Sequence, residues 1–493
     1  MTLEALDARA LESLDGAVQK PQYDRRQVTI GIVHFGVGGF HRAHQAMYVD
    51  ALMNLGKALE WGICGVGTMS VDERMRDVMS AQDGLYTLVL KHTDGTLEPR
   101  VVGSIVDYLY APDDPEAVIS RLADPLTRIV SMTITEGGYN IHHVTGEFDA
   151  NNPLIQKDLQ PGAVPQSVFG LVVEGLARRR ARGIRPFTVM SCDNIQGNGH
   201  VARRVFTAFA RLRDPDLADW IEREVSFPSS MVDRITPATT DADRALVAEQ
   251  LNIDDRWPVV CEPFTQWVLE DDFVDGRPSF EDVGVQIVES VEPYELMKLR
   301  LLNASHQALC YPGYLVGYRL VHEVCQDPLF RDLLMRYMDD EATATLPPVP
   351  GIDLVEYKHS LLERFSNPYV RDTVARLCAE SSDRIPKFLL PVIREQLARG
   401  GEIVRSTAVV ALWARYDEGV DEQGEPIEIV DQLRDRLMAA ARRQRVEPTA
   451  FIEDQGVFGD LAQDDRFRSI YLASLSTIHE HGARALLEQL AGS

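Results

Sequence analysis

This sequence lacks the features that identify several large classes of protein. Its six cysteines are scattered, with no C-x-x-C pair and no regular spacing, which excludes a disulfide-stapled secreted scaffold. No stretch reaches the roughly 18 to 20 consecutive apolar residues of a membrane helix. The amino terminus also lacks the basic start and apolar run of an export signal. We therefore expect a cytoplasmic protein without a membrane partner, with reduced cysteines in its core.

Basic side chains are scarce as well. The chain carries 50 Lys and Arg against 75 Asp and Glu, a formal charge of −25. Because contacts with phosphate backbones need clustered positive side chains, this balance argues against nucleic acid as a partner. It places no limit on a neutral small molecule.

Sequence patterns typical of metal sites are missing. None of the close-spaced histidines lies in an H-E-x-x-H motif or a cysteine-rich ligand set, so we expect chemistry without a metal. The close-spaced histidines are His41 with His44, His142 with His143, and His479 with His481.

The arrangement of apolar residues changes near residue 290. Before that point short β-rich runs alternate with helical patterns, and after Pro293 the sequence is almost purely helix-periodic. Strands that alternate with helices imply a parallel sheet covered on both faces. We therefore predict an α/β fold, with a Rossmann-type, mainly parallel sheet domain over 1–290 and a mostly α-helical domain over 291–493. The β-rich runs lie at 28–35, 61–66, 86–90, 128–134, 186–192, 259–269 and 285–291.

A glycine-rich turn follows the first of these runs. In the segment GVGGF, the glycines Gly36, Gly38 and Gly39 come after a strand and open a helix. Such a turn lets backbone N–H groups face the pyrophosphate of a dinucleotide. His41 replaces the third glycine of G-x-G-x-x-G, so we expect the helix to lie further from the sheet than usual. We assign the three glycines and Phe40 to cofactor binding; a glycine turn without a ligand is the alternative.

An acidic residue after the second strand is expected to hold the adenosine ribose. We assign this role to Asp72, with Glu73 as the second choice, although both lie further downstream than the usual spacing of about 20 residues. Arg74 lies close enough to accommodate a 2′-phosphate. The residues alone therefore leave NAD and NADP both open.

A polar pattern at the start of the helical half is the first candidate for the chemistry. Lys298, Asn303 and His306 form K-x-x-x-x-N-x-x-H. Hydride transfer from an alcohol needs a group that takes the hydroxyl proton and a polar pocket for the developing alkoxide. Pro293 is well placed to start a helix. On an α-helix Asn303 and His306 are neighbours, and a long lysine side chain shares one side with both.

A lysine base has to be uncharged to accept a proton. The pKa of a free lysine is about 10.4, so Lys298 needs surroundings that favour the neutral amine. Burial and the positive end of a helix dipole both act in that direction. A purely structural role, with the lysine stem packed along apolar surface, is the alternative. Tyr294 and Lys298 also form the Y-x-x-x-K pair of short-chain dehydrogenases, but much further from the glycine turn than that family requires.

Three separated motifs occur in the order found in a known family. They are HFGVGGFHRAH near the amino terminus, SFPSSMVDRITP at 226–237, and the K-x-x-x-x-N-x-x-H pattern. On these motifs the chain resembles the polyol-specific long-chain dehydrogenase/reductase family, over nearly its whole length. The segment 364–388 resembles the C-terminal domain of that family. Within it, the members that act on mannitol are the most similar.

This resemblance implies an activity and a set of site residues. The implied reaction is NAD-dependent, metal-independent oxidation of a polyol to a ketose by a monomer, with D-mannitol and D-fructose as the expected pair. Lys298 would be the general acid/base, and Asn194 and Asn303 would donate hydrogen bonds to the reacting oxygen. The residues implied for the polyol pocket are Asp233, His306, Arg376 and Lys387.

Two carboxylates are candidates for passing the proton to solvent. Glu295 lies one helical turn before Lys298, although a glutamate in a first helical turn commonly serves the helix dipole. Glu136, in TITEGGY, is the second candidate, and the glycines beside it equally suggest a turn that contacts the cofactor.

Several other functions fit parts of the pattern. The first group is other members of the same family, such as a fructuronate or tagaturonate reductase or an arabinitol dehydrogenase, because arginine, lysine and histidine also bind a carboxylate. A methyltransferase has a similar glycine turn after its first strand. The last alternative is a non-catalytic dinucleotide-binding protein.

Overall fold

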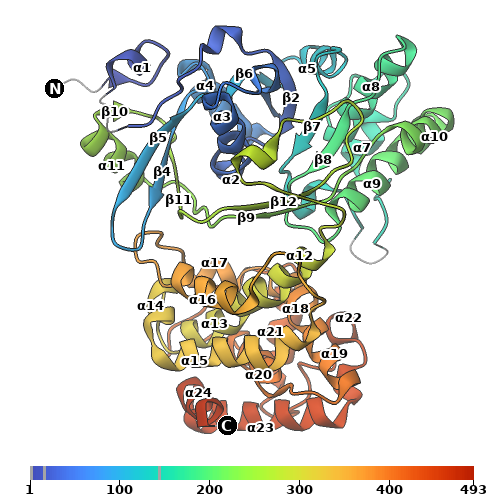
Figure 1. Cartoon of the computed structure of the whole chain (residues 1–493). Helices are drawn as coiled ribbons and strands as arrows, with labels where there is room; N and C mark the ends of the chain where they lie inside the picture. Colours follow the sequence, from blue (N-terminus) through green and yellow to red (C-terminus); the bar gives the residue numbers. More distant parts are fainter. Residues whose placement is uncertain (1–3, 15–17, 143–145, 493) are drawn as a thin grey trace. The chain divides into compact units, whose positions relative to one another are not determined.

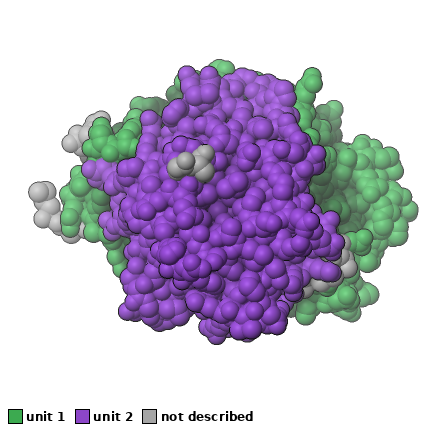
Figure 2. Space-filling view, turned by 90° about the horizontal axis from the view of Figure 1, so that it is seen from below, with its two compact units in different colours: residues 1–292 green, residues 293–493 purple. Residues whose placement is uncertain are grey.

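The computed structural model describes residues 4–14, 18–142 and 146–492. The chain divides into two compact units, Met1–Glu292 and Pro293–Ser493, which we call unit 1 and unit 2. Figure 1 labels their elements, and Figure 2 shows unit 1 in green and unit 2 in purple.

A five-stranded parallel sheet forms the centre of unit 1, with the strand order β6-β3-β2-β7-β8 (Figure 1). The chain moves to one side of β2 for β3 and β6, and to the other side for β7 and β8. In parallel α/β sheets, ligands bind beyond the carboxyl ends of the strands where the order reverses in this way. The predicted Rossmann-type sheet is thus confirmed. Its strands are β2 (Ile30–Phe35), β3 (Gly62–Gly67), β6 (Ile105–Tyr110), β7 (Ile129–Met132) and β8 (Thr188–Ser191).

Alternate residues of these strands enter two different apolar cores. Val33 and Phe35 of β2 join one core, with helices α5, α8, α9 and α10, whereas Ile32 joins the other, with α3 and α4. Because strand side chains point to opposite faces in turn, both faces of the sheet are buried. The helices are α3 (Gln45–Asn54), α4 (Glu73–Ala81), α5 (Pro115–Leu122), α8 (Val168–Ala181), α9 (Asn198–Arg213) and α10 (Pro215–Glu224).

Smaller sheets complete unit 1. Strands β11, β4 and β5 form a three-stranded sheet, and strands β13, β12 and β9 form a second one. Strand β1 pairs with β10 in a two-stranded sheet. Two of these pairings, β4 with β5 and β12 with β9, are antiparallel, so the unit is mainly and not wholly parallel, as predicted. The strands are β1 (Glu4–Ala5), β4 (Tyr86–Lys91), β5 (Leu97–Val102), β9 (Ser230–Asp233), β10 (Ile253–Asp254), β11 (Val259–Cys261), β12 (Gln266–Glu270) and β13 (Gln286–Val288).

Unit 2 is built from helices, as the helical periodicity predicts (Figure 1). Its centre is α13, which is buried along almost its whole length and packs against α17 and α20. The main helices are α12 (Glu292–Met297), α13 (Ala304–Leu315), α15 (Pro328–Arg336), α16 (Leu354–Phe365), α17 (Val374–Cys378), α18 (Ser381–Phe388), α19 (Leu390–Arg399), α20 (Val404–Tyr416), α21 (Arg434–Arg443), α23 (Asp465–His481) and α24 (Ala483–Gly492).

All six cysteines are buried and have free thiols. Across the described ranges of the chain, no helix combines the length and the apolar character that a membrane crossing requires.

Candidate active site

The glycine turn after β2 has a backbone that only glycine tolerates. Gly36 has φ +86°, and a Cβ atom there would lie 2.2 Å from the carbonyl oxygen of Thr133. The Thr133 hydroxyl donates to the Gly36 carbonyl over 2.7 Å. Gly38 is exposed at the amino end of α2 (Gly39–Ala43), and the nearest atom to a Cβ there would be 4.0 Å away. The turn is therefore fixed on the sheet side and open at Gly38.

His41 occupies the position of the missing third glycine, and its ring is buried. It stacks on the ring of His34 in β2, with centroids 3.4 Å apart. The helix that opens at Gly39 also ends early, because His44 leaves helical geometry at φ −125° and ψ −96°, and α3 begins at Gln45. The sequence predicted that the glycines open a helix; in the structure this helix is short, and a second one follows it. Phe40 is half-buried and stacks on His44 at 5.0 Å.

Asp72 holds the backbone of the loop that follows β3. Its Oδ2 accepts hydrogen bonds from the N–H groups of Thr68 and Met69, both over 2.9 Å. The Arg74 guanidinium lies over the ring of Trp257, 4.3 Å from the centroid. Arg74 is the basic side chain that the sequence offers for a 2′-phosphate, and here it makes a cation–π contact with Trp257 instead.

Three of the predicted site residues lie where strands of unit 1 end. Glu136 is exposed in the short helix α6 (Thr135–Gly138) that follows β7, and Asn194 is exposed three residues beyond β8. Asp233 is buried at the last position of β9.

Lys298 begins a distorted part of the helix in unit 2. Residues Lys298–Asn303 form a π-helical segment, η5, between α12 and α13, and the Ala304 N–H donates to the Leu299 carbonyl five residues earlier. The α-helical spacing assumed from the sequence is therefore incorrect at this point. Wider turns bring residues five apart closer to the same side than an α-helix does, so Asn303 moves toward the Lys298 side. Such segments are frequent at functional sites.

Two atoms of this motif are buried without a hydrogen-bond partner among the described residues: Oδ1 of Asn303 and Nε2 of His306. A buried polar atom without a partner is costly, so both atoms are available to a polar ligand or to water. Burial holds the pKa of His306 well below its usual value, and nearby cations act in the same direction. Those cations are Arg376, Arg364, Arg384 and Lys298.

The other predicted residues of unit 2 differ in their surroundings. Lys298 and Glu295 are buried at 8% and 6% exposure. Arg376 acts on His306 and also pairs with Asp372, its Nε donating over 2.7 Å. Lys387, in contrast, is half exposed and pairs with Asp383 on its own helix.

Tyr294 does not have the environment of a catalytic tyrosine. Its side chain is buried, and its hydroxyl donates to the Pro350 carbonyl over 2.8 Å. This bond engages the hydroxyl in packing, which weakens the short-chain dehydrogenase interpretation.

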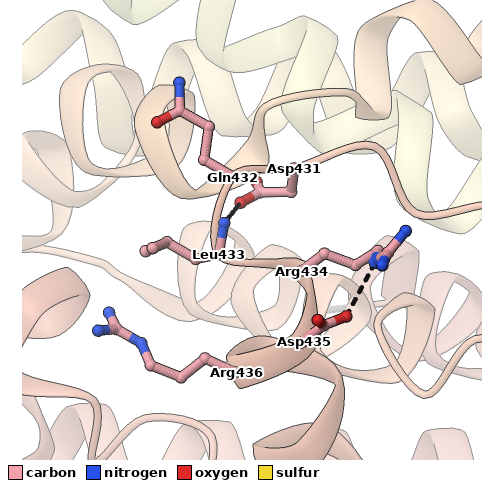
Figure 3. A pocket seen from close by; sticks show the side chains of 6 residues that line it. All are labelled: Asp431, Gln432, Leu433, Arg434, Asp435 and Arg436. Carbon is pink, nitrogen blue, oxygen red and sulfur yellow. Dashed lines mark hydrogen bonds and ion pairs between the residues drawn. The ribbon is translucent and has the colours of Figure 1, made fainter.

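A metal cluster and a surface hollow are the two other kinds of site to consider in this chain. Within the described residues, no group of three or more His, Cys, Asp or Glu is arranged to hold a metal ion. A hollow of about 320 Å³ is lined by the single segment Asp431–Arg436 (Figure 3). Asp431 accepts the Leu433 N–H over 2.7 Å, and Arg434 pairs with Asp435, so these groups already have partners inside the segment. None of the predicted site residues lines this hollow.

The sequence interpretation missed several charged residues near the motifs. Arg364 and Arg384 act on His306, but nothing in their own spacing relates them to it. Asp193, directly before Asn194, carries hydrogen bonds that join two loops. Its position immediately after a predicted strand was the available signal.

Comparison with known proteins matches almost the whole chain to one family. The model of the mannitol dehydrogenase Rossmann domain matches residues 30–282, and that of the mannitol dehydrogenase C-terminal domain matches residues 290–479. A mannitol 2-dehydrogenase of Aspergillus fumigatus is 46% identical over 490 residues, covering 98% of this chain and 97% of the relative. One of Phaeosphaeria nodorum is 47% identical over 490 residues, with 99% and 85% covered.

Two solved structures are similar throughout. The Pseudomonas fluorescens mannitol 2-dehydrogenase, in a ternary complex with NAD and D-mannitol, is 46% identical with a TM-score of 0.91, and 99% of this chain and 100% of that chain are covered. A substrate-free D-sorbitol dehydrogenase is 38% identical, also with a TM-score of 0.91, with 98% and 100% covered.

Proposed function

Because this chain belongs to the mannitol dehydrogenase family, we propose that it oxidises a polyol to a ketose, with D-mannitol and D-fructose as the pair. NAD accepts the hydride, and no metal takes part. The observation that carries the proposal is the match over both units to mannitol 2-dehydrogenases. We further propose that the protein acts as a cytoplasmic monomer.

NAD supplies the nicotinamide carbon that accepts the hydride, and residues of unit 1 hold it. The open position at Gly38, beside the fixed Gly36, admits a pyrophosphate close to the backbone. Gly39 and Phe40 continue this surface. Asp72, fixed by its two backbone bonds, takes the ribose hydroxyls. The engagement of Arg74 with Trp257 supports NAD over NADP.

Lys298 takes the hydroxyl proton during oxidation and returns it during reduction. Its side chain is buried, and burial disfavours the charged form of a lysine, as this step requires. Asn194 and Asn303 donate hydrogen bonds to the reacting oxygen, polarising the C–O bond without adding a charge. Glu295 and Glu136 carry the released proton toward solvent.

The remaining polar residues bind the polyol chain. Oδ1 of Asn303 and Nε2 of His306 have no hydrogen-bond partner within the part of the chain that the structure describes, and we assign both atoms to hydroxyl groups of the polyol. Asp233, Arg376 and Lys387 are assigned to the same hydroxyl-rich substrate.

A coupled assay tests this function directly. We expect fructose-dependent oxidation of NADH, much slower oxidation of NADPH, and activity that survives treatment with EDTA. Binding of NADH without any ketose-dependent oxidation would instead indicate the non-catalytic dinucleotide-binding alternative. Size-exclusion chromatography with light scattering measures the molar mass in solution, and we expect the mass of one chain.

The charges around His306 also favour a second class of substrate, a sugar acid. The three arginines that act on His306 form positive surroundings that suit a carboxylate. A fructuronate or tagaturonate reductase of the same family would use them in this way. Comparing kcat/KM for mannitol, sorbitol, arabinitol, fructuronate and tagaturonate separates these substrates.

A further inference from the structure

Asp193 lies between two loops that carry proposed site residues. It follows β8, one residue before Asn194, and is 7% exposed. Its carboxylate accepts the Ile134 N–H over 3.1 Å and the Thr135 N–H over 2.8 Å, both from the loop after β7. The Tyr139 hydroxyl donates to the same carboxylate over 2.8 Å. Hydrogen bonds to an ionised acceptor are among the strong ones in proteins.

These bonds hold a backbone that is not intrinsically favoured. Thr135 has φ +62°, in the left-handed region that a β-branched residue rarely adopts. Such a residue persists only where its surroundings fix it. Glu136 is the next residue, so the direction of its side chain depends on this fixed turn.

The Asn194 loop is fixed from a second side by Asn198. The Asn198 amide donates to the Asp193 carbonyl over 3.0 Å and to the Ser230 carbonyl over 2.7 Å. It also accepts the Ser230 N–H over 2.9 Å. Ser230 is the first residue of β9, the strand that ends at Asp233.

We propose that Asp193 is a positioning residue, which ties the Asn194 loop to the 134–139 turn and so sets Glu136 relative to Asn194. It acts through these neighbours and does not touch the substrate. The link to catalysis rests on the proposed function, because that function assigns the roles of Asn194 and Glu136.

The charge on Asp193 fits this role. Burial raises the pKa of Asp193 to about 6, and the nearby Glu136 adds to the effect. The ionisable groups that face it are Glu136 and Tyr139 from the turn and Cys192 from its own strand end. At neutral pH the carboxylate is therefore ionised and accepts all three donors, and below about pH 6 protonation weakens this hold.

Asp193→Asn tests the proposal while keeping the side-chain shape. The amide nitrogen of asparagine cannot accept an N–H group, so one of the two backbone bonds is lost. We expect hydrogen exchange in residues 133–140 to become at least about tenfold faster. We expect kcat with mannitol to fall by at least about tenfold, with the Kd for NADH and the KM for NAD within about twofold of the wild-type values.

Asp158→Asn is the matched control. Asp158 is also buried in unit 1 and accepts the N–H groups of Gln166 and Ser167 over 2.9 and 2.8 Å, before α8. We expect its replacement to speed exchange in its own loop and to leave kcat within about twofold. Equal losses of kcat in the two variants would show a general structural effect and overturn the proposal.

The wild-type enzyme provides a second test that does not depend on a variant folding. We expect hydrogen exchange in residues 133–140, corrected for intrinsic rates and compared with exchange in β2, to become faster as the pH is lowered from 8 to 5. Unchanged exchange, in the variant or across this pH range, overturns the proposal, and so does faster exchange with unchanged kcat. If the wild-type enzyme oxidises no polyol, the proposed function fails, and the exchange results alone decide whether Asp193 ties the two loops.

Discussion

At the scale of single residues, the groups to which we assign chemistry are polar atoms that the fold leaves available or holds in place. Nε2 of His306 and Oδ1 of Asn303 are buried without partners among the described residues. Lys298 is buried on the same helical segment. The two unpaired atoms are therefore available to the hydroxyl groups of a ligand.

Lys298→Ala should remove the proton acceptor and leave cofactor binding intact. We expect kcat for mannitol oxidation to fall by about 10²- to 10⁴-fold, with NADH affinity unchanged and partial rescue by added primary amines. Steady-state kinetics and a fluorescence titration measure the two effects. Lys358→Ala is the control, because Lys358 is also a buried lysine of unit 2 but pairs with Asp339. Near-normal turnover in Lys298→Ala would contradict the assignment.

At the scale of elements, the sequence predicts what depends on local pattern. The alternation of strands and helices gave the fold class, and the three motifs gave the family, which both units match. The break at His44 and the π-helical segment were not predictable in this way. In the sequence, His44 continues the helical pattern. In the structure its backbone leaves helical geometry, and the preceding His41 stacks on His34 of β2, a contact that helical periodicity does not predict.

The π-helical segment is accompanied by a contact distant in the sequence. The Arg300 carbonyl accepts the Tyr337 hydroxyl over 3.0 Å. Four residues after Arg300, the Ala304 N–H donates to Leu299 instead. In an α-helix the Ala304 N–H would donate to the Arg300 carbonyl; here the Tyr337 hydroxyl, 37 residues away, is the donor. Helical periodicity therefore could not predict the π-helical segment.

Tyr337→Phe should therefore change catalysis through the helix. Removing the hydroxyl leaves the Arg300 carbonyl without this donor, at a cost of about 1–3 kcal/mol, and favours a return toward α-helical spacing. We expect kcat to fall while NADH binding persists. Tyr471→Phe is the control, since it removes another buried hydroxyl of unit 2, which donates to Gln444. We expect both variants to lose a similar amount of thermal stability and only Tyr337→Phe to show a lower kcat. Equal kcat values in the two variants would contradict the prediction.

Two glycines of the turn after β2 should separate folding from cofactor binding. Gly36→Ala places a Cβ at φ +86° and 2.2 Å from the Thr133 carbonyl oxygen, so we expect a loss of at least about 1–3 kcal/mol in the free energy of unfolding. Gly38→Ala meets no protein atom closer than 4.0 Å. It should keep wild-type stability yet weaken NADH binding by at least about tenfold, since the methyl group enters the pyrophosphate position. Unchanged affinity in folded Gly38→Ala would contradict dinucleotide binding at this turn.

At the scale of the whole molecule, several histidines are buried in a form that resists protonation. Burial lowers the pKa of His34 to about 3 and holds the pKa values of His41 and His306 well below the usual value. His34 connects strands of the central sheet, with Nδ1 2.8 Å from the Ser131 hydroxyl and Nε2 3.0 Å from the Thr133 hydroxyl. The same hydroxyl of Thr133 donates to Gly36, so protonation of this network affects the fold and the cofactor turn together.

Acid should consequently destabilise the protein well before the carboxylates are neutralised. The folded pKa of His34 is depressed, so below about pH 6.5 the unfolded chain binds a proton that the folded chain does not, and the free energy of unfolding falls as pH decreases toward 3. Each such histidine contributes a slope of up to about 1.36 kcal/mol per pH unit. Urea unfolding between pH 7.5 and 5 should show a shallower slope in His34→Asn than in the wild type. His481→Asn, which replaces an exposed histidine, should keep the wild-type slope. Identical slopes in all three proteins would mean that His34 already carries its proton in the folded sheet.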